Sequence, residues 1–224
     1  MPAAATVLAG INLERVRTSP LRPQLPPAAQ AFLVSLESAR SVLVASDGTN
    51  YLVLMRGDFR QAPVGGTLLA SGLAAMGSPD WVRTAESHRG GTANPLLARA
   101  TPLAASADIW MAAAGSANLP VTGNGENLNR LLHATEYATL AVRLTDNADF
   151  EVTALCGGPE PARNWEETVR AFVKLGAAAT KRQPELSGLL RQIRITRDDR
   201  TVHVTLTARA DELQAVLKLL GIGS

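Results

Sequence analysis

Cys156 is the most reactive side chain in the sequence, and it is the only cysteine. It ends a run that predicts a strand and precedes GGPEPARNWEE, which predicts a helix start. A thiolate at a helix N-terminus has a lowered pKa, and a histidine brought near by folding would activate it as a nucleophile. The ordinary role of a lone cysteine is that of a small buried apolar residue, and this role is favoured because no flanking sequence matches a Cys-His enzyme.

The other residues capable of metal or acid-base chemistry are three histidines, His88, His133 and His203. They are widely separated in sequence and lack the i, i+4 pairing that marks a metal-binding helix. A single cysteine also excludes an intramolecular disulfide and a cysteine-based zinc site. We therefore expect no metal and no cofactor, and we assign no catalytic residue in the favoured interpretation.

Glycine-rich stretches are candidates for phosphate binding. They are VGGTLLASG, SHRGGTANP and VTGNGENLNR. None of them has the pattern of a P-loop or of a dinucleotide-binding turn. TGNGEN precedes a predicted helix, so its backbone amides could bind an anion. Loop and N-cap geometry already accounts for Gly123, Asn124 and Gly125.

Basic residues gather between Lys181 and Arg200 and include Arg191, Arg194 and Arg197. Strand spacing places Arg194 and Arg197 on opposite faces, and Asp198 and Asp199 partly neutralise the group. The net charge is only +2 and aromatic residues make up 4% of the chain. Dedicated nucleic-acid binders show a dense basic face or aromatic stacking platforms, so no nucleic acid is expected as a partner.

The length and composition of the chain indicate the kind of fold that positions these side chains. A chain of 224 residues with 46% hydrophobic residues can bury a substantial core, in one large or two small domains. No apolar run is long enough to span a membrane. The abundance of arginine and alanine is typical of a GC-rich bacterial genome. The compartment stays open: cytoplasmic if Met1 is the native start, periplasmic or secreted if a signal peptide was trimmed.

In the first half, the pattern predicts a strand at 5–13, a helix at 28–39 and a hairpin at 41–59 that turns at Asp47-Gly48. One further strand is predicted at 65–77, weakened by Gly72. A helix then begins with Ser78 as N-cap and Pro79 in its first turn.

The second half shows the same order with one addition. It predicts a strand at 106–116, a helix at 125–138, a hairpin at 138–158, a hairpin at 193–208 and a last helix at 210–220. The addition is a long helix that begins near Pro161 and is interrupted at Pro184. Its core-facing candidates are Trp165, Val169, Phe172, Val173 and Leu175.

This shared order predicts an α+β fold of two related strand-helix-hairpin-strand-helix units, with a mainly antiparallel sheet and helices packed on one face. The units span 1–90 and 105–224, joined by a linker at 91–104, unless the chain forms one continuous domain. The phrases AGINLERVRTSPL, VLMRGDF and GSPDWVRTA resemble those of uncharacterised bacterial proteins built of tandem α+β units. That resemblance implies no activity.

Two functional hypotheses follow. The first is a non-catalytic protein that binds a ligand or an unknown protein partner or supports assembly, because no chemically convergent motif is present and a helix-free sheet face would offer a binding surface. The second is a small hydrolase or thiol enzyme with residues scattered in sequence, for which Cys156 is the only nominee. Oligomeric state is not indicated by the sequence.

Overall fold

We analysed a computed structural model that describes residues 1–87, 94–119, 125–180, 184–213 and 217. The described strands are β1 (Val7–Asn12), β2 (Ala39–Ser46), β3 (Tyr51–Gly57), β4 (Thr67–Ala70), β5 (Leu73–Gly77), β6 (Ile109–Ala114), β7 (Tyr137–Leu144), β8 (Asn147–Leu155), β9 (Arg194–Asp198) and β10 (Thr201–Arg209). The described helices are α1 (Leu13–Thr18), α2 (Pro27–Ser35), α3 (Pro79–Ser87), α4 (Leu97–Ser106), α5 (Gly125–His133), α6 (Pro159–Ala179) and α7 (Pro184–Gln192), with a 3-10 turn at Arg22–Gln24.

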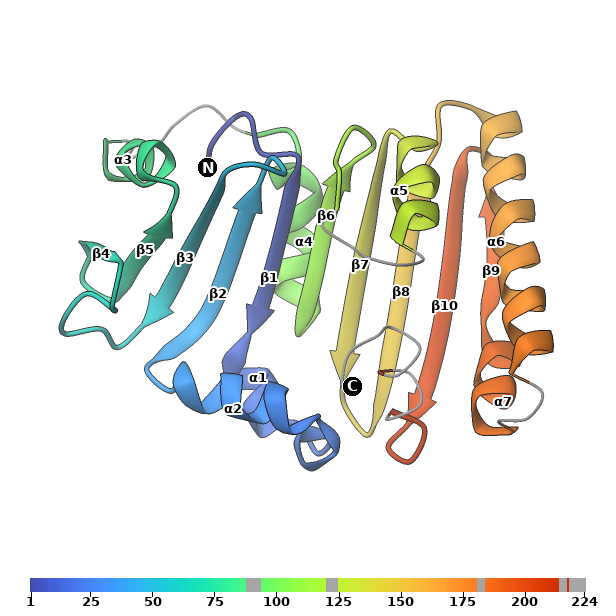
Figure 1. Cartoon of the computed structure of the whole chain (residues 1–224), viewed down its shortest axis with the longest axis horizontal. Coiled ribbons are helices and arrows are strands. Elements are labelled where there is room, and N and C mark those ends of the chain that lie inside the picture. The colour runs from blue at the N-terminus through green and yellow to red at the C-terminus, as the bar shows by residue number, and fades with distance from the viewer. Residues whose placement is uncertain (88–93, 120–124, 181–183, 214–216, 218–224) are drawn as a thin grey trace.

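All ten strands form a single sheet in the order β4-β5-β3-β2-β1-β6-β7-β8-β10-β9. Every neighbouring pair is antiparallel. The predicted α+β class with a mainly antiparallel sheet is therefore confirmed. Figure 1 shows the strands side by side across the width of the molecule, with helices in front of and behind them.

One face of the sheet, called here the front face, is apolar along most of its width. Because side chains alternate along each strand and directly paired residues share a face, the register assigns Val42, Met55, Val142 and Val202 to it. Helices α1, α2 and α7 pack on it through Leu13, Val16, Leu33 and Leu189. Helix α6 packs there through Ala162 and Trp165.

The opposite face, called here the back face, changes character from one half to the other. Its β1, β2 and β6 side chains include Leu8, Ala45 and Ala112, which are buried beneath Leu96 and Ala100 at the start of α4 and within it. Helix α3 packs into the same cluster. The back face of β8 and β10 instead carries polar side chains such as Glu151, Thr205 and Thr207.

Helices therefore lie on both faces, and the expectation that they share one face is corrected. In Figure 1, α4 is drawn behind the strands and α5 in front of them. The physical reason is the back face of β1, β2 and β6, which is as apolar as the front and must also be shielded from water. Beyond those strands the polar back face needs no such cover.

Several predicted elements are present as expected. Strands β2 and β3 form a hairpin whose connection contains Gly48 at φ +95°, and β7–β8 and β9–β10 form the other two predicted hairpins. Helix α3 begins at Pro79 after Ser78, whose carbonyl accepts hydrogen bonds from the backbone of Trp81 and Val82. The last predicted helix, 210–220, falls mostly outside the described residues, although Leu213 is buried in the core.

Two predicted elements are different in the structure. Residues 65–77 were expected to form one strand, but they form the hairpin β4–β5, because Gly72 takes φ +73° and reverses the chain. The predicted linker at 91–104 contains most of α4, even though Pro102 lies inside that helix. Asn94 anchors its start, since its buried amide nitrogen donates to the carbonyls of Pro2 and Ala5 at 3.0 and 2.9 Å.

Candidate functional site

Cys156 is fully buried at the end of β8, in a cluster with Ala154, Trp165 and Val202. Burial raises the pKa of its thiol, and the negative charge of Glu136 raises it further. The expected lowering by a helix N-terminus is therefore wrong, because desolvation of the thiolate outweighs any helix dipole here. This environment disfavours the thiolate that a thiol enzyme would need as its nucleophile.

The described histidines do not converge with Cys156 or with each other. His133 lies at the end of α5, where its Nε2 is 3.0 Å from the carbonyl oxygen of Ala117. His203 lies on the back face of β10, with its Nδ1 3.1 Å from the hydroxyl of Thr153. No cluster of three or more metal-ligating side chains occurs among the described residues; His88 lies outside them.

The glycine-rich stretches have local structural roles where the structure describes them. Gly72 makes the β4–β5 turn, and Gly65 has φ +74° in the loop before β4. Gly125 begins α5, whereas Gly123 and Asn124 lie outside the described residues, as does the core of SHRGGTANP.

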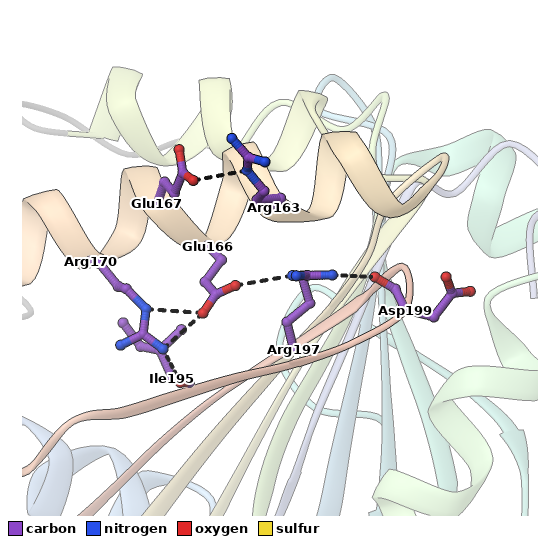
Figure 2. Close-up of polar contacts among 7 residues, drawn as sticks. All are labelled: Arg163, Glu166, Glu167, Arg170, Ile195, Arg197 and Asp199. Carbon is purple, nitrogen blue, oxygen red and sulfur yellow. Dashed lines mark hydrogen bonds and ion pairs between the residues drawn. The ribbon is translucent and has the colours of Figure 1, made fainter.

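Arg194 and Arg197 lie on opposite faces of the sheet, as their spacing predicted. Arg197 lies on the front face of β9, where its Nε donates to Glu166 on α6 at 3.1 Å. Arg170 on the same helix donates to Glu166 at 2.8 Å and to the backbone carbonyl of Ile195 at 2.6 Å (Figure 2). Arg194 lies on the back face, paired with Thr205 of β10.

These contacts attach α6 to the outermost strand of the sheet. A sheet edge exposes unpaired backbone carbonyls and amides that can recruit other strands. Arg170 satisfies one such carbonyl, and Glu166 lies between Arg170 and Arg197 (Figure 2). Hydrogen bonds from Arg170, and then from Arg197, lower the pKa of Glu166 despite its partial burial. The cluster therefore has a structural role in covering β9.

A groove lies between α5 and α6. Its cavity measures about 450 Å³. Its lining is Asn127, Arg130, Leu131, Ala134, Pro161, Asn164, Trp165, Thr168 and Phe172. Both helices lie in front of the sheet in Figure 1, and both pack on its front face, α6 through Trp165 and α5 through Leu132.

Trp165 joins the two walls of this groove. It is largely buried, and its indole nitrogen donates to the carbonyl oxygen of Leu131 on α5 at 3.0 Å. Because this N–H is already satisfied, the ring offers only apolar surface to a ligand. Phe172 lies two turns further along α6 and is 40% exposed. Its ring therefore adds partly exposed apolar surface to the lining of the groove.

Polar groups surround the apolar lining. Asn127 and Arg130 come from α5, and Asn164 and Thr168 come from α6. The hydroxyl of Thr168 donates to the Asn164 backbone carbonyl at 2.8 Å, and both residues line the groove. Arg130 is exposed and forms no ion pair with a described carboxylate. The groove thus combines apolar walls with amides and one cation.

The sequence pattern did not indicate this groove. Trp165, Phe172 and Leu175 were all predicted to face the core, but Phe172 and Leu175 are exposed. The core-facing positions Trp165, Val169 and Val173 recur every four residues. Phe172, seven residues after Trp165, lies at the edge of the same stripe, and Leu175 falls off it. The periodicity of α6 therefore gave no signal that pointed to the groove.

Comparisons with known proteins extend to the fold alone. No model of a known protein family matches the sequence, and no curated protein matches it. Solved structures of a protein designated TP0453 have the same overall fold. Its crystal form III has a TM-score of 0.53 at 9% identity, covering 95% of this chain and 94% of that one. Crystal form I has a TM-score of 0.52 at 9% identity, covering 96% and 94%.

The match over nearly the full length of both chains shows a shared arrangement of the sheet and its helices. At this identity it carries no residue of a site from one protein to the other. Across the described helices, none combines the length and the apolar character that a bilayer crossing requires.

Proposed function

We propose that this protein is a non-catalytic binding protein and that the α5–α6 groove holds a small amphipathic molecule. The observation that carries the proposal is the cavity of about 450 Å³ between two helices, with Trp165 in its wall and Phe172 exposed beside it. Pockets for small molecules have volumes of roughly 300–1,000 Å³ and are mostly apolar with a few polar groups.

The size of the groove favours a small ligand over a protein partner. A stable protein interface buries on the order of 800 Å² on each partner, whereas a cavity of about 450 Å³ is of the size that holds one small molecule. The chemistry of the lining describes the ligand further. An apolar body would contact Trp165 and Phe172, and a carboxylate, sulfonate or carbonyl end would accept hydrogen bonds from Arg130 or Asn164.

The thiol-enzyme alternative has no comparable support. Its nominee, Cys156, is buried away from the groove surface, and its raised pKa keeps it protonated at neutral pH.

Binding of the dye 8-anilinonaphthalene-1-sulfonate tests the proposal, because the dye joins an aromatic body to an anionic end. We expect the dye to bind the folded protein saturably. The fluorescence of the dye measures this binding. Ala134→Phe, which fills the groove, and Phe172→Ser, which removes an apolar wall, are each expected to weaken binding roughly tenfold. Arg130→Gln is expected to weaken binding of the sulfonate dye but not binding of the uncharged dye N-phenyl-1-naphthylamine.

Leu175→Ser is the matched control. Leu175 is an exposed apolar residue of the same helix, at 66% exposure, and does not line the groove. It is expected to leave dye affinity unchanged, and circular dichroism of each variant checks that the fold is retained. Equal loss of affinity in Leu175→Ser and Phe172→Ser, or no saturable binding by the wild type, would overturn the proposal.

A further inference from the structure

A second hollow lies on the back face, at the corner where α7 leads into β9. It measures about 450 Å³ and is lined by Arg191, Gln192, Arg194, Thr205 and Thr207. Unlike the groove on the front face, its lining is polar throughout. It belongs to neither the α5–α6 groove nor the Glu166 cluster.

The lengths of the neighbouring elements create this corner. Strand β10 runs to Arg209, but its partner β9 begins at Arg194, opposite Thr205. Thr207 therefore lies beyond the first residue of β9, on the same face as Thr205. Helix α7 ends at Gln192, two residues before β9 begins, and brings Arg191 and Gln192 to this exposed flank of β10.

The two charged side chains that line the corner are arginines, and neither is ion-paired among the described residues. Arg191 donates to the neutral hydroxyl of Ser187 at 3.3 Å. Among the described residues, neither Arg191 nor Arg194 forms an ion pair with a carboxylate, in contrast to Arg197, which binds Glu166. Two carboxylates lie next to the corner, and each accepts a hydrogen bond from a neutral lining residue. Thr207 donates to Asp149 at 2.6 Å, and Gln192 donates to Glu212 at 3.1 Å.

The donor groups of this corner suit an oxyanion. Guanidinium groups present planar pairs of N–H donors that match the oxygens of a phosphate or a carboxylate. The Thr205 hydroxyl adds a neutral donor beside them. Because the lining offers little apolar surface, an apolar ligand would gain little by entering. We propose that this corner pocket is a binding site for a small oxyanion, carried by a phosphate- or carboxylate-bearing metabolite.

Titration calorimetry at low ionic strength, about 20 mM salt, tests the proposal with inorganic phosphate and acetate as separate probes. We expect saturable binding of at least one probe with a stoichiometry of one. Tighter binding of phosphate would indicate a phosphate-bearing metabolite as the ligand, and tighter binding of acetate would indicate a carboxylate-bearing one. In the double variant Arg191→Gln, Arg194→Gln, affinity for the bound probe is expected to fall at least tenfold.

The matched control is the double variant Arg22→Gln, Arg60→Gln, which removes the same charge from exposed arginines outside the pocket. It is expected to bind the probe within twofold of the wild type. Equal losses in the two double variants would show nonspecific attraction and overturn the proposal, as would absence of binding of both probes to the wild type. Because the dye site is separate, Arg191→Gln, Arg194→Gln should leave dye binding intact, so the two proposals fail independently.

Discussion

At the residue scale, burial determines what Cys156 can do. The thiol is fully enclosed, and its pKa is raised by that burial and by Glu136. We therefore expect a thiol reagent such as 5,5′-dithiobis(2-nitrobenzoic acid) at neutral pH to label the folded protein at least about 100-fold more slowly than the urea-unfolded chain, because labelling must await an opening event. The release of thionitrobenzoate measures both rates. Comparable rates in the two states would show that the thiol is accessible.

Residue types predicted the core better than they predicted the sites. Trp165 is buried, as the apolar stripe of its predicted helix indicated. The two proposed pockets are built from residues such as Asn164 and Thr205, which are ordinary surface residues in sequence. Their significance depends on which elements lie side by side, and a single sequence does not record that arrangement.

At the element scale, the ion-pair cluster of Glu166 holds α6 against the edge strand β9. Its side chain is only 17% exposed and accepts hydrogen bonds from Arg170 and Arg197. Networks of this kind contribute more than a single exposed pair, because one carboxylate orders two partners at once. The attachment is expected to contribute to the stability of the whole sheet edge.

Glu166→Gln is expected to lower the free energy of unfolding by about 1 kcal/mol at pH 7. Because the pKa of Glu166 is lowered in the folded protein, its contribution is complete above the unfolded-state pKa and is lost as the pH falls through the folded-state pKa. The difference between the wild type and Glu166→Gln should therefore vanish at acidic pH. Urea unfolding at a series of pH values measures it.

Glu167→Gln provides the control for this measurement. Glu167 is the next residue of the same helix, is 61% exposed and pairs with Arg163 alone. It is expected to change stability by less than about 0.5 kcal/mol at every pH. A pH-independent loss in Glu166→Gln would mean that packing of the side chain, and not its charge, attaches the helix.

Elements with strong local signals were predictable, and elements set by context were not. The β2–β3 hairpin was predicted from Asp47-Gly48, whose conformational preference acts locally. Helix α4 was missed because Pro102 and the preceding glycines indicate a loop. Its stability comes instead from the burial of Ala100 and Leu96 against the back face of the sheet, a tertiary contact that overrides local propensity.

At the scale of the whole molecule, the strand order is symmetric about its centre. Reading outward from the β1–β6 pair gives β2, β3, β5 and β4 on one side and β7, β8, β10 and β9 on the other. Corresponding strands thus occupy corresponding positions in the two halves. The descent of the halves from a duplicated unit stays a prediction, which this order supports together with the shared order of elements along the chain.

The two halves meet at the β1–β6 pair, called here the seam, and residues of both halves pack together in the core on either side of it. One cluster joins Leu8 and Ala45 of the first half to Trp110 and Ala141 of the second, and another joins Val42 to Val142 and Leu189. Trp110 lies directly opposite Gly10, and a Cβ added at Gly10 would lie 2.5 Å from its ring. Close packing across the seam therefore depends on glycine at this position.

Because these clusters cross the seam, we expect the protein to unfold in one cooperative transition, with equal calorimetric and van't Hoff enthalpies. Gly10→Val should force Trp110 out of place, cost about 1–3 kcal/mol and lower the midpoint of the whole transition by roughly 5 °C without splitting it. Gly157→Val, at a position with open space around it, should leave the midpoint nearly unchanged. Two resolved transitions by calorimetry would instead show that the halves are separate domains, as the predicted division at 91–104 allows.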